Sequence, residues 1–245
     1  RADGVVTIHV LEGRLKVIVD EEAREIGRDE LMALVSHQMR GPLTVVATSV
    51  HIQQELLGSP SPSLEELGVH ARQIGDATHR MSSLVKNLLD AARVDAGSVR
   101  IAPARVVLAG VLDEVIEILS PTARRRGQTF VLRADEQLVV TCDRDLTVVA
   151  LSNLVDNAIK FSPDGATIAI RAHRERTNAH ICVVDEGPGI APQDLPRVFQ
   201  RYWQAPGTAR HGIGLGLYIA RTYLEAQGGH IRADSKPGHG SEFCF

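Results

Sequence analysis

The sequence predicts an α plus α/β protein, in which a helical hairpin dimerises into a four-helix bundle and an α/β sandwich domain follows it. Three observations carry this prediction. Apolar residues recur at helical spacing over residues 29–100, one run rich in glycine and proline interrupts them, and strand-like and helical runs alternate beyond residue 100. The chain has 245 residues, 44% of them hydrophobic, which is enough to bury cores of this kind.

Residues 1–28 are expected to be the end of an upstream sensor or linker segment. Residues 4–19, GVVTIHVLEGRLKVIV, alternate apolar and polar side chains on both sides of Glu12-Gly13, which predicts two short strands joined by a turn. Such a hairpin is only marginally stable in isolation. From Asp20 onward, acidic residues followed by good helix formers predict the start of a long helix.

The first long helix carries an apolar stripe with steps of three and four residues, which predicts a buried face. The stripe consists of Leu31, Val35, Met39, Leu43, Val46 and Val50. At about 100° per residue, His37 lies about 170° from the centre of this stripe, so its side chain is expected to face solvent. The sequence GSPSP at 58–62 ends the helix.

A second helix follows, with apolar residues every seven positions and further ones three residues later, as in the seam of a bundle. These residues are Leu67, Ile74, Met81 and Leu88, with Ala77, Leu84 and Ala91. The short connection predicts an antiparallel hairpin, and because two helices bury their apolar faces poorly, a homodimeric four-helix bundle is expected over residues 29–100.

Residues 101–245 are expected to form a separate α/β domain. Strand-like runs (QTFVLRA, ATIAIRAHR, NAHICVVDE) alternate with helical runs (RDLTVVALSNLVDNAIKFS, GLGLYIARTYLEAQGG). Helices that cover one sheet would produce this pattern.

Three polar residues in NLVDNAIK share one face of a predicted helix, because Asn153, Asn157 and Lys160 follow at steps of four and three. An amide oxygen can coordinate Mg²⁺, and a lysine can neutralise phosphate charge. Alternatively, the three residues form an ordinary solvated face.

In VVDEGPGI, a strand ends at Asp185 and continues into Gly187 and Gly189. A carboxylate at this place can accept a hydrogen bond from an exocyclic amine, and the glycines allow a ligand to approach the backbone. An ordinary turn explains the same residues equally well.

Gly212, Gly214 and Gly216 precede a helix with apolar periodicity, so their amides could cradle phosphates. A dinucleotide-binding fingerprint would require a buried strand directly before the glycines. The preceding WQAPGTAR is no such strand, which excludes that interpretation.

The exposed histidine is followed in order by NLVDNAIK, DEGPGI, RVFQRYWQ and GIGLGL, and this series resembles the catalytic core of sensor histidine kinases from about Asp29 to the end of the chain. The resemblance implies a HisKA-type dimerisation and phosphotransfer domain over 29–100 and a GHKL-type ATP-binding domain over 101–245. It implies ATP-dependent autophosphorylation of His37, with transfer to an aspartate on the receiver domain of a response regulator. ATP, Mg²⁺ and a second copy of the chain are therefore expected partners.

The resemblance also implies a role for each residue of the site. His37 is the phospho-accepting histidine and Gln38 stands beside it. Asn157 coordinates Mg²⁺, Lys160 contacts phosphate, and Asn153 and Phe161 belong to the same ATP-binding helix. Asp185 recognises the adenine amine, Gly187 and Gly189 shape the pocket, and Gly212, Gly214 and Gly216 form the lid over the triphosphate.

The sequence departs from the family pattern at a few places. Gln38 replaces a usually acidic residue and cannot take a proton. Gly41 stands where threonine or asparagine is common, and Gln204 stands where arginine is common. These departures leave open a degenerate kinase that acts as a nucleotide-gated signalling scaffold. A hydrolysing ATPase of the same fold is disfavoured, because Asn153 occupies the place of its water-activating glutamate.

Charge and composition exclude other classes of function. A formal net charge of −3 disfavours nucleic-acid binding. Cys142, Cys182 and Cys244 lie far apart, and all three are interpreted as packing residues in a reducing compartment. No apolar run reaches the roughly 18 residues needed to cross a bilayer. A cytoplasmic segment without membrane contact is therefore expected.

Overall fold

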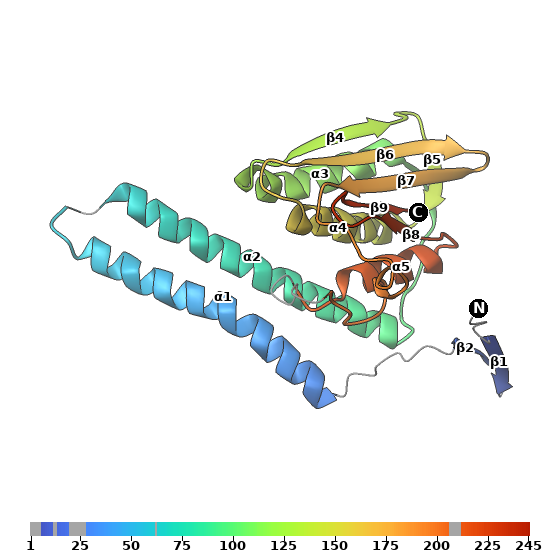
Figure 1. Cartoon of the computed structure of the whole chain (residues 1–245), viewed down its shortest axis with the longest axis horizontal. Coiled ribbons are helices and arrows are strands. Elements are labelled where there is room, and N and C mark those ends of the chain that lie inside the picture. Colours follow the sequence, from blue (N-terminus) through green and yellow to red (C-terminus); the bar gives the residue numbers. More distant parts are fainter. Residues whose placement is uncertain (1–5, 12–13, 20–27, 62, 206–211) are drawn as a thin grey trace.

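The structure is a computed structural model that describes residues 6–11, 14–19, 28–61, 63–205 and 212–245. Near the N-terminus, β1 (Val6–Leu11) and β2 (Arg14–Val19) pair as antiparallel strands, which confirms the predicted hairpin (Figure 1). The Glu12-Gly13 turn and the predicted helix start at Asp20 lie outside the described residues.

Two long helices, α1 (Arg28–Leu57) and α2 (Leu64–Asp95), form the predicted antiparallel hairpin (Figure 1). The Ser63 side chain caps α2 by accepting a hydrogen bond from the Glu66 amide at 3.2 Å. Across the hairpin, the buried Ser49 donates a hydrogen bond from Oγ to Oε1 of the exposed Gln73 at 3.0 Å, which links the two helices. None of the helices in the described part of the chain is long and apolar enough to cross a membrane.

The single chain covers the predicted apolar stripe of α1 only in part. Ser49, outside the stripe, is buried against α2, whereas Leu43 is 53% exposed and Val50 39% exposed. The physical reason is that one neighbouring helix can cover only one side of a wide apolar face. The hairpin therefore retains an uncovered apolar row, made of Met32, Leu43, Val50 and Leu57 on α1 and Val85 and Leu89 on α2.

Beyond residue 100 the chain forms a two-layer α/β unit. Its elements are β3 (Ala104–Val107), α3 (Leu108–Arg125), β4 (Thr129–Ala134), β5 (Val139–Cys142), α4 (Arg144–Phe161), β6 (Thr167–Glu175), β7 (Asn178–Asp185), the 3₁₀ turn η1 (Leu195–Arg197), α5 (Gly216–Ala226), β8 (Arg232–Ser235) and β9 (Ser241–Cys244). Three strands and two helices match the predicted runs, which confirms the α/β fold class. The helix α3 and the short strands β3, β5, β8 and β9 were not anticipated.

The main sheet has the strand order β4-β6-β7-β9-β8, in which β4 and β6 are parallel and the other pairs are antiparallel. The strands β3 and β5 form a separate antiparallel pair. Helices α3, α4 and α5 lie on one side of the main sheet (Figure 1). Their apolar faces and the inward side chains of the sheet, such as Ile168 and Ile170, form the core. Within the part of the chain that the structure describes, no helix covers the opposite face of the sheet, and polar side chains alternate onto it (Figure 1).

Two of the cysteines differ from the prediction. Cys182 on β7 and Cys244 on β9 are joined by a disulfide, whereas Cys142 is free. The two cysteines are 62 residues apart in sequence, but the register of β7 and β9 places them directly opposite one another. Their neighbours Ile181 and Phe245 exchange both backbone hydrogen bonds, so the cysteines occupy the adjacent non-hydrogen-bonded pair, where Cα atoms approach closely. Their Cα atoms are 4.1 Å apart.

Candidate functional site

The helix α4 carries the polar face that the sequence predicted. Asp143 caps the helix by accepting a hydrogen bond from the Leu146 amide at 3.1 Å, and one face, which includes Leu151 and Leu154, is buried in the core. The half-buried side chains of Asn153, Asn157 and Lys160 lie off that face. The burial of the apolar side therefore fixes the rotation of α4 and leaves the three polar residues only partly covered.

Asp185 ends β7 as a buried carboxylate, 6% exposed. Its Oδ1 atom accepts hydrogen bonds from the Gly187 amide at 2.8 Å and from the Ser241 amide at 3.1 Å. Burial raises the pKa of Asp185 above its usual value, while these two backbone bonds act in the opposite direction. Because both hydrogen bonds are made to Oδ1, they hold the carboxylate in one orientation. Oδ2 takes part in neither of the two bonds.

The glycines after Asp185 are required by close backbone packing. A Cβ atom on Gly187 would lie 2.7 Å from Asp185 Oδ1 and 3.1 Å from the Phe161 carbonyl oxygen. Gly189 has a φ of 73°, and a Cβ atom there would lie 2.2 Å from the Lys236 carbonyl oxygen. The loop that follows Asp185, residues 186–189, therefore packs against Phe161, the last residue of α4, at Gly187.

The glycine segment before α5 closes the other end of the site. Gly214 has a φ of 71°, and a Cβ atom on it would lie 2.4 Å from the Trp203 carbonyl oxygen. The Gly214 carbonyl accepts a hydrogen bond from the Tyr202 amide at 2.8 Å, and the Gly212 carbonyl accepts one from Gln204 Nε2 at 2.5 Å. Residues 206–211, which precede the three glycines of the predicted lid, lie outside the described residues.

Gly216 links this segment to α4, since a Cβ atom on Gly216 would lie 2.9 Å from Asn153 Oδ1. Asn153, in the middle of α4, therefore lies next to the start of α5, and Phe161, the last residue of α4, lies next to the Asp185 loop. Asn157 lies one helical turn from each of them. The structure brings the predicted residues of α4, the Asp185 loop and the glycine segment together along one strip.

Lys160 and Asn157 differ in their surroundings. Lys160 Nζ forms an ion pair with Asp156 Oδ2 at 2.5 Å, a partner that sequence reasoning did not consider. The side-chain amide of Asn157 makes no hydrogen bond within the residues that the structure describes. A half-buried amide oxygen without such a bond fits a magnesium ligand, because hard cations prefer oxygen donors.

His37 lies apart from this strip, on α1. Its side chain is exposed, as the periodicity predicted, and Gln38 beside it is half-buried. Two nearby positions on α1, Gly41 and Thr44, bear on the chemistry at His37. Gly41 is exposed, with nothing within 4 Å of a Cβ atom placed there, and Thr44 Oγ1 donates to the Arg40 carbonyl at 2.9 Å.

Sequence reasoning missed two residues of the Asp185 site. Ser241 supplies the second amide to the carboxylate. Gly240 has a φ of 77°, and a Cβ atom there would lie 2.0 Å from the Asp185 carbonyl oxygen. The glycine-rich sequence PGHGSEF was the available signal, but nothing in it indicates that β9 pairs with β7.

Comparison with known families accounts for both halves of the chain. Residues 27–97 match the family described as the His Kinase A (phospho-acceptor) domain. Residues 142–245 match the family described as histidine kinase-, DNA gyrase B-, and HSP90-like ATPase. The first family is what separates a kinase core from the other ATPases that share the second domain.

This chain belongs to the sensor histidine kinases. The kinase core is 34% identical over 225 residues to the adaptive-response sensory kinase SasA of a Synechococcus species, which covers 89% of this chain and 58% of that protein. It is 33% identical over 229 residues to the sensor-like histidine kinase SenX3 of Mycobacterium tuberculosis, which covers 92% of this chain and 55% of that protein. The kinase core thus spans slightly more than half the length of these two relatives.

Solved structures show the same architecture. Full-length ShkA in complex with AMPPNP aligns with a TM-score of 0.61 and 26% identity, over 83% of the kinase core and 45% of ShkA. ThkA in complex with the response regulator TrrA aligns with a TM-score of 0.62 and 22% identity, over 94% of the kinase core and 68% of ThkA. The similarity to ThkA, at 22% identity, is a similarity of fold.

Proposed function

We propose that this kinase core uses ATP to phosphorylate His37 and then transfers the phosphoryl group to an aspartate of a response-regulator receiver domain. The observation that carries the proposal is the combination, in one chain, of an exposed imidazole on a helical hairpin with the Asp185 and α4 strip. Membership of the sensor histidine kinases supports it. We assign residues 29–100 to the phosphotransfer domain and 101–245 to the ATP-binding domain.

The strip supplies a distinct group for each part of ATP. The fixed carboxylate of Asp185 accepts a hydrogen bond from the adenine amine. Gly187 and Gly189, which are packed against the neighbouring backbone, shape the adenine pocket. Lys160 reaches a phosphate by exchanging its ion pair with Asp156. Gly212, Gly214 and Gly216 lead into the N-terminus of α5, where backbone amides favour anions.

Asn157 would hold Mg²⁺ through its amide oxygen, and the ion would offset negative charge on the phosphates when bound. The neutral imidazole of His37 attacks the γ-phosphorus in line. A nitrogen–phosphorus bond forms, the bond from the γ-phosphorus to the bridging oxygen breaks, and ADP leaves. Gln38 can orient the imidazole by hydrogen bonding but cannot accept a proton, so the proton on the other ring nitrogen passes to solvent, to which His37 is exposed.

A second copy of the chain is part of the proposal. The uncovered apolar row on α1 and α2 would be buried if two hairpins packed into a four-helix bundle. Burying such a row is favourable at roughly 25 cal/mol per Å² of apolar surface. The receiver domain would dock on the hairpin near His37, and the proposal places the core in the cytoplasm, where ATP is available.

The alternative function is a nucleotide-gated scaffold that transfers no phosphate. Its support is Gln38, and Gln204, whose side chain bonds the Gly212 carbonyl rather than offering a positive charge. Phosphate transfer is favoured because the exposed His37 has no evident role in a scaffold.

Incubation of the protein with γ-labelled ATP and Mg²⁺ tests the proposal. A label that is stable to base and lost in acid indicates phosphohistidine, and it should disappear in His37→Ala. His51→Ala is the matched control, because His51 is also exposed on α1. ATP binding without any label would support the scaffold, and release of free phosphate without a labelled protein would support an ATPase.

A further inference from the structure

The face of the main sheet opposite the helices gathers sulfur and imidazole side chains. Along β7, Ile181 and Val183 point into the core, so His180 and Cys182 point to the other face. Cys244 on β9 lies opposite Cys182, and His173 on β6 lies opposite His180. Three adjacent strands therefore place two cysteines and two histidines on one face of the sheet, which the proposed kinase mechanism does not use.

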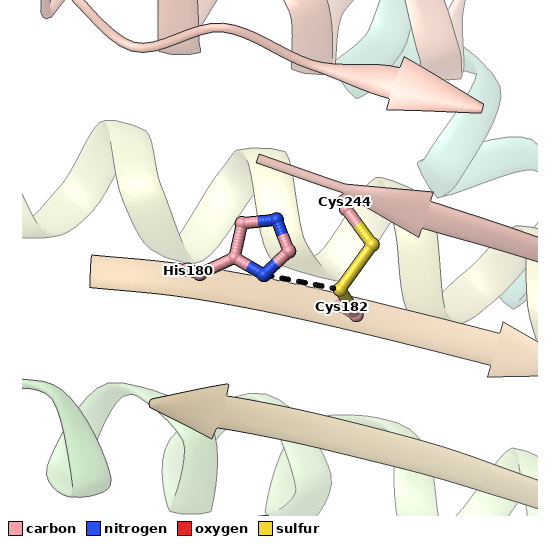
Figure 2. Close-up of side chains that lie close together, drawn as sticks. All are labelled: His180, Cys182 and Cys244. Carbon is pink, nitrogen blue, oxygen red and sulfur yellow. Dashed lines mark hydrogen bonds between the residues drawn. A yellow bond between two sulfur atoms is a disulfide. The ribbon is translucent and has the colours of Figure 1, made fainter. Parts of the chain in front are cut away.

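The sulfur atoms and one imidazole are close enough to share a ligand. His180 Nδ1 lies 3.7 Å from Cys182 Sγ, and Figure 2 shows the ring beside the sulfur pair. One ligand atom from each of His180, Cys182 and Cys244 lies within 4.8 Å of the others. Tetrahedral zinc, with bonds of about 2.3 Å to sulfur and about 2.0 Å to nitrogen, needs ligand atoms roughly 3.5 Å apart. Small side-chain rotations would satisfy this requirement once the sulfur–sulfur bond is opened.

We propose that the reduced chain binds Zn²⁺, or another thiophilic metal ion, through Cys182, Cys244 and His180, with water at the fourth position. A dithiol reductant supplies two electrons and two protons to the disulfide, which yields two thiols while the reductant itself becomes a disulfide. Metal binding then displaces both thiol protons. The disulfide and the metal site are mutually exclusive states of the same sulfur pair.

A second group of ligands competes for the imidazole of His180. Among the described residues, His173, Glu175 and His180 also place ligand atoms within 4.8 Å of one another. His173 and Glu175 are exposed, whereas Cys182 is 5% and Cys244 2% exposed. The sulfur set is favoured because thiolates are strong ligands for zinc and the paired strands already hold both sulfurs in place.

Titration of the whole chain with Co²⁺, followed by Zn²⁺, tests the proposal. The protein is reduced with a phosphine, which opens the disulfide without adding a competing thiol. One Co²⁺ per chain should bind with thiolate-to-cobalt charge-transfer absorption, and Zn²⁺ should displace it. The oxidised chain should show no such absorption.

Four variants assign the ligands. Cys182→Ser and Cys244→Ser should each abolish the charge-transfer absorption of the two-sulfur site, and His180→Asn should weaken binding on the order of tenfold or more. Cys142→Ser is the matched control, because Cys142 is free and lies on β5, and it should bind as the unmodified chain does.

Two results would overturn the proposal. One is a reduced, folded chain, checked by circular dichroism, that binds no Co²⁺. The other is metal binding that survives both cysteine variants and is lost in His173→Ala, which would assign the ion to the exposed group. If the cysteine variants do not fold, His173→Ala decides, because His173 belongs only to the exposed group and the proposal expects Co²⁺ binding to persist in this variant.

Discussion

The Tyr223 hydroxyl donates a hydrogen bond of 3.1 Å to Asp90 Oδ1, and it thereby joins α5 of the ATP-binding half to α2 of the hairpin. Tyr223 is 2% exposed and Asp90 4% exposed. Burial and then the negative charge of Asp90 raise the pKa of Tyr223 to about 12. The hydroxyl therefore remains a donor at neutral pH. Two exposed or half-exposed ion pairs, Arg125–Asp76 and Arg201–Asp95, also join the halves, but such pairs contribute little.

Replacing Tyr223 with phenylalanine is expected to loosen the contact between α5 and α2. A hydrogen bond to a charged group contributes about 1.5–3 kcal/mol, and its loss leaves a buried carboxylate without this donor. Tyr223→Phe should lower the thermal midpoint and speed amide hydrogen exchange in α5. Asp90→Asn, which retains the oxygen acceptor, is the milder control. Unchanged exchange in Tyr223→Phe would contradict the prediction.

The same residue predicts a pH dependence at the alkaline end. The pKa of Tyr223 in the folded protein, about 12, lies above the ordinary tyrosine value of 10.0. Its contribution to stability is therefore fully present below pH 10 and is lost as the pH rises toward about 12. Denaturant titrations across this range should show a smaller alkaline loss in Tyr223→Phe than in the unmodified chain. Parallel curves for the two proteins would contradict it.

Asp185→Asn is expected to weaken ATP binding without lowering stability. The folded pKa of Asp185 is raised above 3.8, so its contribution to stability is present below pH 3.8 and is lost as the pH rises through the folded value. At neutral pH the buried carboxylate is therefore a cost that asparagine removes, while its oxygen can still accept from Gly187 and Ser241. Calorimetric titration should show ATP affinity falling more than GTP affinity. Unchanged ATP affinity, or strong destabilisation, would contradict the assignment.

Asn157→Ala is expected to abolish the Mg²⁺-dependent part of nucleotide binding. Alanine removes the amide oxygen but retains a good helix former, so α4 should persist. The measurement is ATP titration with Mg²⁺ and again with a chelator present. Asn178→Ala, at an exposed position at the start of β7, is the control and should bind as the unmodified chain does. A magnesium-dependent affinity equal to that of the control would refute the ligand assignment.

Gly41→Thr is expected to raise phosphatase activity toward a phosphorylated response regulator. Residue 41 lies one helical turn after His37, where the family resemblance places a hydroxyl or amide that orients water. A side chain fits, because nothing lies within 4 Å of a Cβ atom at Gly41. Thr44 cannot readily substitute, since its hydroxyl already donates to the Arg40 carbonyl. Autophosphorylation should change only a few-fold.

The assay for this variant is the decay of a purified phosphorylated regulator with ADP present. Gly41→Ala is the matched control, because it adds a Cβ atom without a hydroxyl and should leave the decay slow. Rapid decay with the unmodified protein, undiminished in Thr44→Ala, would show that another group positions the water.

Periodicity in the sequence was sufficient for the hairpin, the exposed face of His37 and the polar face of α4. Each of these properties belongs to one helix, and the spacing of apolar residues fixes which side of a helix is buried. The strands β4, β6 and β7 were predicted for the same reason. The helix α3 was missed although its buried residues follow a helical spacing, whereas β8 and β9 are four residues each and too short to show a period.

Contacts between remote elements could not be obtained in this way. The Ser241 amide reaches Asp185, Cys182 meets Cys244, and Tyr223 meets Asp90 because of strand register and helix docking. These arrangements minimise the free energy of the whole chain, and a period within one segment carries no information about which partner another segment chooses. Local sequence therefore determines which residue types form the site, whereas the burial, the orientation and the shifted pKa values of these residues arise from tertiary packing.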